Sequence, residues 1–328
     1  MILDGQQPGS IDCAADALAA GELVGLPTET VYGLAGDAGN DAAVRAIFAA
    51  KARPAEHPLI VHVASAADVG AFAAEVPAFA QRLIDAFWPG PLTVILPRRP
   101  GVASAAAGGQ PTVGLRCPAH PVAQALLAAC AARGVRGLAA PSANRFGRVS
   151  PTTAAHVAAE FPDLRVLDGG PCAVGIESTI VDCTRGAPVL LRPGQLARAD
   201  IERAVGQRLL SNEELPAQAP KASGTLSAHY APQAPVRLMN ARELRTALDL
   251  LGSDARHIAV WMRGPQSARP SALRQRMPDS AAEAAHALFA VLRAFDAAGA
   301  KLIWIETPPD DPAWDGVRDR LQRAAASA

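Results

Sequence analysis

Short apolar runs alternate with longer segments of helical periodicity over residues 1–208. The apolar runs predict strands at 22–27, 59–63, 92–96, 112–116, 138–141, 164–167, 179–183 and 189–192. Apolar residues at helical spacing predict helices at 40–53, 76–88, 120–133 and 201–208. A further helix is expected to start at Ser150, with the serine as the cap and Pro151 in the first helical position. This alternation predicts an α/β domain with an open sheet.

Residues 209–235 interrupt the pattern, because they contain several prolines and little periodic hydrophobicity, as is typical of a linker. Beyond it, strands are predicted at 236–239, 257–262 and 301–306, and helices at 242–251, 281–298 and 314–325. We therefore expect a second, smaller Rossmann-like α/β domain over 236–328. No Gly-x-Gly-x-x-Gly follows its first strand, so a dinucleotide is not an expected ligand.

The composition argues against several classes of protein. Thirty-one basic and 31 acidic residues give a formal net charge of zero, which argues against a domain whose main task is to bind nucleic-acid phosphates. Five cysteines without a Cys-x-x-Cys pair indicate a reducing compartment with neither disulfides nor a zinc ribbon. No signal-peptide pattern is seen, nor an apolar stretch of about 18 residues. We expect a cytoplasmic protein that does not enter the membrane.

Polar residues gather at the ends of the predicted strands in the first domain, which is where open α/β sheets bind ligands. The segments are Pro27-Thr28-Glu29-Thr30-Val31-Tyr32-Gly33, Lys51-Ala52-Arg53-Pro54, Pro58-Leu59-Ile60-Val61-His62, Pro141-Ser142-Ala143-Asn144 and Ser150-Pro151-Thr152-Thr153. Their hydroxyls, backbone amides and fixed cations suit a phosphorylated anion beside a small zwitterion, because arginine binds carboxylate and phosphate through paired hydrogen bonds. No nucleophile stands beside a base. The pattern predicts a site that positions reactants and stabilises charge, as phosphoryl-type transfer requires.

These segments occur in order with Trp88-Pro89-Gly90-Pro91-Leu92-Thr93, Gly114-Leu115-Arg116-Cys117-Pro118, Asp168-Gly169-Gly170, Glu177-Ser178-Thr179 and Leu191-Arg192-Pro193-Gly194. The ordered set resembles the YrdC-type threonylcarbamoyl-AMP synthases. The linker motif His229-Tyr230-Ala231-Pro232 and the added C-terminal unit resemble the long, two-domain form of that family. The resemblance implies a YrdC-like twisted open α/β sheet in the first domain.

The resemblance also implies a reaction. The family makes L-threonylcarbamoyladenylate and pyrophosphate from L-threonine, bicarbonate and ATP, with Mg²⁺. The product feeds the N6-threonylcarbamoyl modification of adenosine 37 in tRNAs that read ANN codons, so a tRNA threonylcarbamoyl transferase complex is the expected recipient. Direct contact with tRNA is expected to be weak or indirect.

Site residues follow by similarity at the matching positions. L-threonine would be bound by Thr30, Tyr32, His62, Arg116, the backbone of Ala140, and Ser178. ATP would be bound by Arg53, His57, Thr112, Ser142, Asn144, Ser150, Arg192 and Tyr230. Lys51 and Arg53 would be the catalytic residues. No metal ligand is assigned, because Mg²⁺ would be held mainly by the ATP phosphates. The family usually has asparagine at position 57 and often glycine at position 52.

Other functions stay open at this point. An RNA-binding module of the YrdC-like type, without adenylating activity, is the main alternative. A carbamoylating enzyme of the hydrogenase-maturation kind would need zinc-finger-like cysteines and an acylphosphatase-like domain, and neither is seen. The second domain could cover the active site, hold the linker or contact a tRNA-modification partner. We also expect ligand to order the linker and to bring Tyr230 over the nucleotide.

Taken singly, several of these residues have simpler interpretations. His62 could be a buried core histidine, Tyr32 could only pack, and Arg192 could belong to a surface ion pair of little energetic value. Cys117 and Cys172 are expected to be buried, inert thiols rather than nucleophiles.

Overall fold

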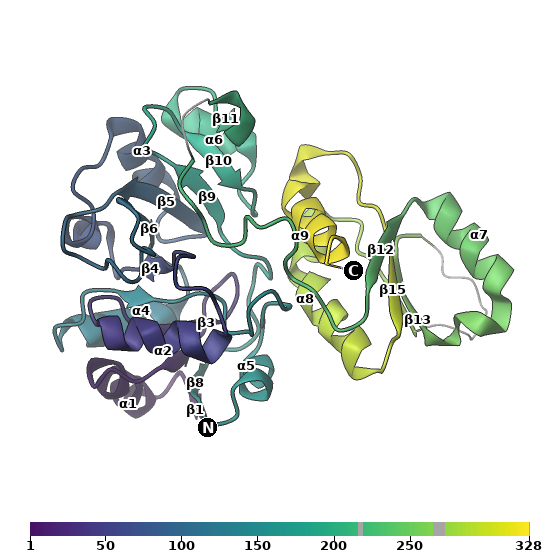
Figure 1. Cartoon of the computed structure of the whole chain (residues 1–328), viewed down its shortest axis with the longest axis horizontal. Helices are drawn as coiled ribbons and strands as arrows, with labels where there is room; N and C mark the ends of the chain where they lie inside the picture. The colour runs from purple at the N-terminus through teal and green to yellow at the C-terminus, as the bar shows by residue number, and fades with distance from the viewer. Residues whose placement is uncertain (216–218, 265–272, 328) are drawn as a thin grey trace. The chain divides into compact units, whose positions relative to one another are not determined.

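The computed structural model describes residues 1–215, 219–264 and 273–327. The chain forms two compact units (Figure 1). The first comprises Met1–Phe146 and Ser150–Thr225, and the second comprises Gly147–Val149 and Leu226–Ala328. The boundary after Thr225 lies inside the predicted linker, whose first part therefore packs as part of the first unit.

The first unit contains one mixed sheet. Its strands are β1 (Ile2–Asp4), β2 (Val24–Leu26), β3 (Gly33–Asp37), β4 (Ile60–His62), β5 (Leu92–Pro97), β6 (Thr112–Arg116), β7 (Leu138–Ala139), β8 (Arg165–Asp168), β9 (Thr179–Asp182), β10 (Val189–Arg192) and β11 (Leu210–Ser211). Among the described residues they lie in the order β1-β8-β2-β3-β7-β4-β6-β5-β9-β10-β11. The twisted open sheet that the sequence predicts is confirmed.

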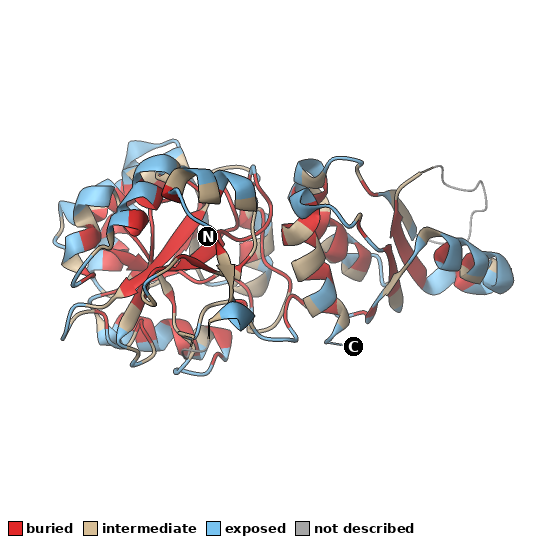
Figure 2. Cartoon of the chain, turned by 90° about the horizontal axis from the view of Figure 1, so that it is seen from above, coloured by how far each residue is buried: buried red, intermediate tan, exposed pale blue. Residues whose placement is uncertain are grey.

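Helices cover both faces of this sheet. They are α1 (Pro8–Ala19), α2 (Asp41–Lys51), α3 (Ala78–Phe87), α4 (Pro121–Ala131), α5 (Ala154–Glu160) and α6 (Arg198–Val205), with short 3-10 turns η1 (Ala66–Ala71) and η2 (Asn212–Glu214). Helices α1 and α4 share one hydrophobic core, and α2, α3, α5 and α6 share the other. Neighbouring residues of one strand, such as Leu138 and Ala139 of β7, enter opposite cores because side chains alternate along a strand. Figure 2 shows the strands as the buried layer of this unit.

Helix α2 shows how the sequence places a functional side chain. Asn40 caps its start by accepting hydrogen bonds from the amides of Ala42 and Ala43. Its buried face carries apolar residues at helical spacing, and that same face ends with Lys51 in the last turn. The chain then leaves the helix through Ala52 at a φ of 51°. The only polar group on the buried face is thus a lysine ammonium.

The second unit is a smaller α/β sheet. Its strands are β12 (Val236–Met239), β13 (Ile258–Met262), β14 (Leu273–Arg276) and β15 (Leu302–Glu306), and its helices are α7 (Ala241–Leu251), α8 (Ala281–Ala297) and α9 (Asp315–Ala325), with 3-10 turns η3 (Gly252–His257) and η4 (Pro312–Trp314). The strands that the structure describes here run parallel in the order β12-β15-β13-β14. The predicted second α/β domain is confirmed.

Two expectations need correction. The helix predicted to start at Ser150 begins at Ala154, and Thr153 is its cap, accepting from the His156 amide at 3.2 Å. The Ser150 hydroxyl instead donates to Glu177, so Ser150 and Pro151 present no helix N-terminus to an anion. Part of the predicted linker is also regular, because β11 pairs with β10 and η2 follows it.

No helix within the described ranges is long and apolar enough to cross a membrane. All five cysteines lie in those ranges and are free thiols.

Candidate active site

Strand register brings His62 and Arg116 together. They are paired residues at the carboxyl ends of the parallel strands β4 and β6. On the other side of β6, antiparallel β5 begins at Leu92, which is opposite Thr179 at the start of β9. Side chains that lie far apart in the sequence therefore meet at one end of the central strands, where ligands bind in open α/β sheets.

Arg116 is the centre of a buried polar cluster. Its Nη1 donates to the Thr30 hydroxyl at 2.7 Å, and its Nε donates to the Gly90 carbonyl at 3.3 Å. Its Nη2 lies 2.7 Å from Glu29 Oε1, forming an ion pair between two buried side chains. Thr30 is held in turn by Thr28, whose hydroxyl lies 3.0 Å from that of Thr30. The guanidinium is thereby fixed in orientation before any ligand enters.

His62 lies beside this cluster as a neutral imidazole. The residue is buried, and burial, followed by the positive charge of Arg116, lowers the pKa of His62 to about 3. Its Nδ1 has no hydrogen-bond partner among the described residues. The ring can therefore offer a ligand a hydrogen bond without adding a second positive charge next to Arg116.

Ser178 lies in a second buried cluster with Arg192. Arg192 donates to the Ser178 carbonyl from Nε at 3.1 Å and from Nη2 at 2.8 Å, and Nη2 also reaches the Ser178 hydroxyl at 3.2 Å. The Ser178 hydroxyl lies 2.8 Å from that of Thr93 on β5. Arg192 is only 3% exposed, so the interpretation as a surface ion-pair member is wrong.

Lys51 is buried and holds a loop of the site. Its Nζ donates to the Ser142 carbonyl at 2.5 Å and to the Asn144 carbonyl. Burial, and next the positive charge of Arg53, holds the pKa of the Lys51 ammonium well below its ordinary value. An ammonium has three N–H donors, so one N–H is left for a ligand after these two bonds.

Arg53 emerges from the turn that follows α2. It donates to the carbonyls of His57 at 3.4 Å and Pro58 at 3.0 Å, and its guanidinium carbon lies 5.5 Å from the centre of the Phe146 ring. The His57 ring contacts Phe146 edge-on, and burial, followed by the charge of Arg53, lowers the pKa of His57. The Arg53 guanidinium and the His57 ring thus both pack against the Phe146 ring.

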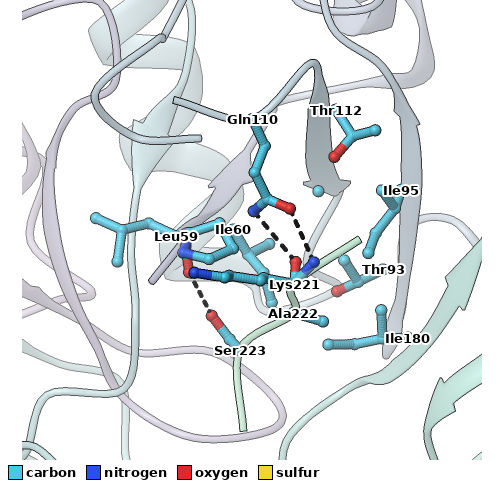
Figure 3. A pocket seen from close by; sticks show the side chains of 12 residues that line it. Leu59, Ile60, Thr93, Ile95, Gln110, Thr112, Ile180, Lys221, Ala222 and Ser223 are labelled. Carbon is cyan, nitrogen blue, oxygen red and sulfur yellow. Dashed lines mark hydrogen bonds between the residues drawn. The ribbon is translucent and has the colours of Figure 1, made fainter. Parts of the chain in front are cut away.

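A narrow pocket is lined by residues of β4, β5, β6 and β9 and by the segment 221–223 (Figure 3). Thr112, Thr93 and Gly114 line its walls, and the segment Lys221-Ala222-Ser223 lines the remaining side. The space left between them is about 20 Å³, which is room for about one water molecule. Thr112, which the resemblance assigns to ATP, lines this pocket, and the protein's own chain borders the same space.

The segment Lys221-Ala222-Ser223 is anchored by specific hydrogen bonds. The Lys221 amide donates to the Gln110 side chain at 2.8 Å, and the Ser223 hydroxyl donates to the Pro58 carbonyl at 2.7 Å. Arg53 donates to the Ser223 hydroxyl at 3.2 Å, and Arg192 donates to the Ser223 carbonyl at 2.9 Å. Two arginines that the resemblance assigns to ATP thus bind the start of the predicted linker.

Tyr32 has a defined local partner. Its hydroxyl donates to the Gly170 carbonyl at 2.7 Å and accepts from the Gly169 amide at 3.1 Å. The ring is fully buried, and burial raises the pKa of the phenol. Tyr32 therefore fixes the loop after β8, and its assignment to threonine stays a prediction. Ala140 follows β7, and its amide donates to the Ile60 carbonyl at 3.1 Å.

Two more assigned residues are buried, and one belongs to the other unit. Ser150 donates to Glu177, and Asn144 donates from its side chain to the Arg145 carbonyl at 2.7 Å. Tyr230 lies in the second unit at a φ of 62°, with its ring 5.5 Å from that of Phe289. Its assignment to ATP stays a prediction.

The buried thiols are poor nucleophiles. Burial raises the pKa of Cys117, and burial, with a further contribution from Glu29, raises that of Cys172 to about 12. The sequence interpretation of both as inert is consistent with this. Within the described ranges no group of three or more His, Cys, Asp and Glu side chains is placed to hold a metal ion.

Sequence reasoning did not assign several residues that the geometry brings to the site. Glu29 and Glu177 lie inside the motifs at 27–33 and 177–179, yet the resemblance assigns neither of them a role. Both are buried, one against Arg116 and the other against Ser150. No local sequence pattern singles out Gln110 or Ser223, because Gln110 acts by binding the Lys221 amide and Ser223 by binding the Pro58 carbonyl, both far away in the sequence.

Two family models match consecutive parts of the chain. The Sua5/YciO/YrdC model, which is described as telomere recombination, matches residues 16–194. The model of the threonylcarbamoyl-AMP synthase C-terminal domain matches residues 196–326.

Named relatives match over nearly the full length. A threonylcarbamoyl-AMP synthase of Pyrococcus abyssi is 37% identical over 325 residues, covering 96% of this chain and 94% of the relative. One from Bacillus subtilis is 35% identical over 324 residues, covering 95% and 92%. The crystal structure of P. abyssi Sua5 complexed with L-threonine is similar at a TM-score of 0.88 and 36% identity, covering 98% of this chain and 95% of that one.

Proposed function

Because the chain belongs to the threonylcarbamoyl-AMP synthase family, we propose that it converts L-threonine, bicarbonate and ATP into L-threonylcarbamoyladenylate and pyrophosphate. The product serves the N6-threonylcarbamoyl modification of adenosine 37 in tRNAs that read ANN codons. A tRNA threonylcarbamoyl transferase complex is the proposed recipient. In enzyme class, the protein is proposed to be a nucleotidyltransferase.

One structural observation gives this proposal its strongest support. Thr30, His62 and Arg116, which the resemblance assigns to threonine, come from three separate segments and lie together in one buried polar cluster. A fixed guanidinium with a neutral imidazole beside it suits a small carboxylate ligand, because each charged hydrogen bond contributes about 1.5–3 kcal/mol net.

The proposed reaction has two stages. The threonine ammonium first releases a proton, and the free amine attacks the carbon of bicarbonate-derived CO₂. The new N–C bond forms as one C=O π bond opens onto oxygen, and loss of a second proton from nitrogen gives the carbamate. A carbamate oxygen then attacks the α-phosphorus of ATP, and the bond to pyrophosphate breaks. Lys51 and Arg53 are the proposed charge-stabilising groups, since both are buried cations close to the Ser142–Asn144 loop and the Thr112 pocket.

Magnesium is proposed as part of the nucleotide substrate. Mg²⁺ in nucleotide sites is usually bound by phosphates, water and one or two carboxylates rather than by a cage of protein ligands. Among the described residues no group of three or more His, Cys, Asp and Glu side chains is placed to hold a metal ion, so no protein ligand is proposed for Mg²⁺. Bound in that way, it would neutralise charge on the phosphates.

The test is pyrophosphate release from ATP, Mg²⁺, bicarbonate and L-threonine, with each component omitted in turn. Mass spectrometry of the nucleotide product runs beside it. We expect release that requires both threonine and bicarbonate, together with a threonylcarbamoyl-adenylate peak. Release without threonine would indicate another nucleotidyl transfer.

The same experiment separates the alternative function. A folded protein that releases no pyrophosphate but binds RNA with a steep salt dependence would be an RNA-binding module instead.

A further inference from the structure

Glu29 is a buried carboxylate whose two oxygens accept no hydrogen bond from a described residue. The residue is 9% exposed, and its Oε1 lies 2.7 Å from Arg116 Nη2. Its Oε2 is enclosed, and no described residue gives it a hydrogen bond. Leaving a buried charged oxygen unpaired is costly, so such a group calls for a partner that the protein alone does not supply.

The other donors of Arg116 show where that partner belongs. Nη1 is bound to Thr30, which is next to Glu29 in the chain, and Nε is bound to Gly90. Two of the five N–H donors of the guanidinium are bound to Thr30 and Gly90, and Nη2 contacts Glu29 as an ion pair without a hydrogen bond, so N–H groups remain for a ligand carboxylate. A ligand carboxylate bound at Nη2, which lies 2.7 Å from Glu29 Oε1, would lie beside the carboxylate of Glu29.

Charge decides which ligand fits there. The buried Glu29–Arg116 pair is neutral as a unit, so a monoanion would leave one uncompensated negative charge in the cluster. An amino acid adds no net charge, because its carboxylate meets the guanidinium and its ammonium meets the carboxylate. His62 is neutral and adds no charge of its own to this balance.

We propose that Glu29 binds the ammonium group of the amino-acid substrate and thereby selects α-amino acids over α-hydroxy acids. The inference rests on the proposed function and deepens it, since it adds a specificity-determining residue to the amino-acid site. The competing explanation is that Glu29 only orients Arg116. In that case both ligand classes would depend on Glu29 equally.

The test uses two ligands that differ only at the group in question. L-threonine and (2S,3R)-2,3-dihydroxybutanoate are titrated by calorimetry into the full-length wild-type protein and into Glu29→Gln. We expect the wild type to prefer threonine by about 10-fold to 100-fold, which is the range of one charged hydrogen bond. We expect that preference to fall to within about threefold in Glu29→Gln, because the amide keeps the shape and removes the charge.

A matched control is available in the second unit. Glu306 is a buried carboxylate that pairs with Arg263 at 2.7 Å. Glu306→Gln removes a similar buried charge and should leave the preference unchanged. Equal weakening of both ligands by Glu29→Gln would overturn the proposal and leave Glu29 as a positioning residue for Arg116.

Two further results also test the proposal. If Glu29→Gln does not fold, Glu29→Asp replaces it, and the pulled-back carboxylate should give an intermediate preference. An unchanged preference in a folded Glu29→Asp variant would overturn the proposal. A wild-type protein that binds neither ligand would refute the proposed function, and this inference with it.

Discussion

The neutral histidine at the end of β4 makes the first unit sensitive to acid. His62 has a pKa of about 3 in the folded unit against an ordinary value of 6.5, chiefly because it is buried. Below pH 6.5 the unfolded chain binds a proton on this side chain that the folded unit does not bind. The contribution of His62 to the free energy of unfolding should therefore be greatest above pH 6.5 and should fall as the pH decreases toward 3.

The size of the effect follows from the same two values. Each pH unit between them costs about 1.4 kcal/mol, so the loss should be about 2 kcal/mol at pH 5. It would level off at about 5 kcal/mol below pH 3, as an order of magnitude. Replacing the ring by glutamine removes this titration but keeps a side chain that can hydrogen-bond.

Hydrogen exchange resolved by peptide is the suitable assay, because three of the four tryptophans lie in the second unit and would dominate a fluorescence signal. Opening free energies are measured for peptides covering β4 and β6 from pH 5 to 8, after correction for the intrinsic pH dependence of exchange. The wild type should lose about 2 kcal/mol more than His62→Gln over that range.

The control is His257→Gln, which removes an exposed histidine of the second unit. It should leave the acid sensitivity of β4 and β6 unchanged. If wild type and His62→Gln lost stability in parallel between pH 8 and 5, His62 would already be charged or solvated in the folded unit, and the neutral imidazole in the site would be refuted.

Three further substitutions test the other clusters of the site. Arg192→Lys should lower kcat/KM for pyrophosphate release by about 10-fold to 100-fold, because a lysine lacks the planar guanidinium that binds the Ser178 carbonyl through two nitrogens and the Ser223 carbonyl through the third; activity within threefold would contradict this. Tyr32→Phe should lower the free energy of unfolding by about 1–3 kcal/mol in urea, because Gly169 and Gly170 lose their shared partner. A KM for threonine within twofold of the wild type would remove Tyr32 from the threonine site. A KM raised tenfold would instead place the phenol on the substrate. Lys51→Met should slow turnover by about 10²–10³ with an unchanged circular dichroism spectrum, and a rate close to that of the wild type would exclude Lys51 from charge stabilisation.

The sequence predicts most of the fold because its signals are local. The helix that Asn40 caps appears within two residues of its predicted end, and the strands of the second unit that carry Ile, Val and Trp are found where expected. Strand β3 is missed because Gly33 and Gly36 give its five residues little strand propensity, and pairing with β2 and β7 forms it instead. Strand β14 is missed because Leu273–Arg276 is mostly polar and is held by pairing with β13.

The sequence predicts a site residue when that residue lies in a motif. It does not predict a residue whose role depends only on tertiary contacts. The sequence predicts a helix start at Ser150, because serine before proline is a strong local signal. The Glu177 carboxylate competes for the same hydroxyl, and Thr153 takes over the cap. Ser223 contacts Pro58 from 165 positions away, which no local pattern encodes. Glu29 lies in one of the motifs that the sequence reveals. Its role, however, follows from its burial against Arg116, which no local pattern shows.

The start of the linker is bound by two arginines that the resemblance assigns to ATP, so the linker and a nucleotide would compete for the same hydrogen-bond donors. Arg53 binds the Ser223 hydroxyl and Arg192 binds the Ser223 carbonyl. A triphosphate carries several negative charges and hydrogen-bonds to a guanidinium more strongly than a neutral carbonyl or hydroxyl does. Each contact of the segment with an arginine has one charged partner and contributes about 1.5–3 kcal/mol net, whereas an arginine–phosphate contact has two, so phosphate oxygens should displace Ser223 when ATP binds through these side chains. The expected effect of nucleotide on Lys221-Ala222-Ser223 is therefore a change of position, rather than the simple ordering that its linker composition suggests.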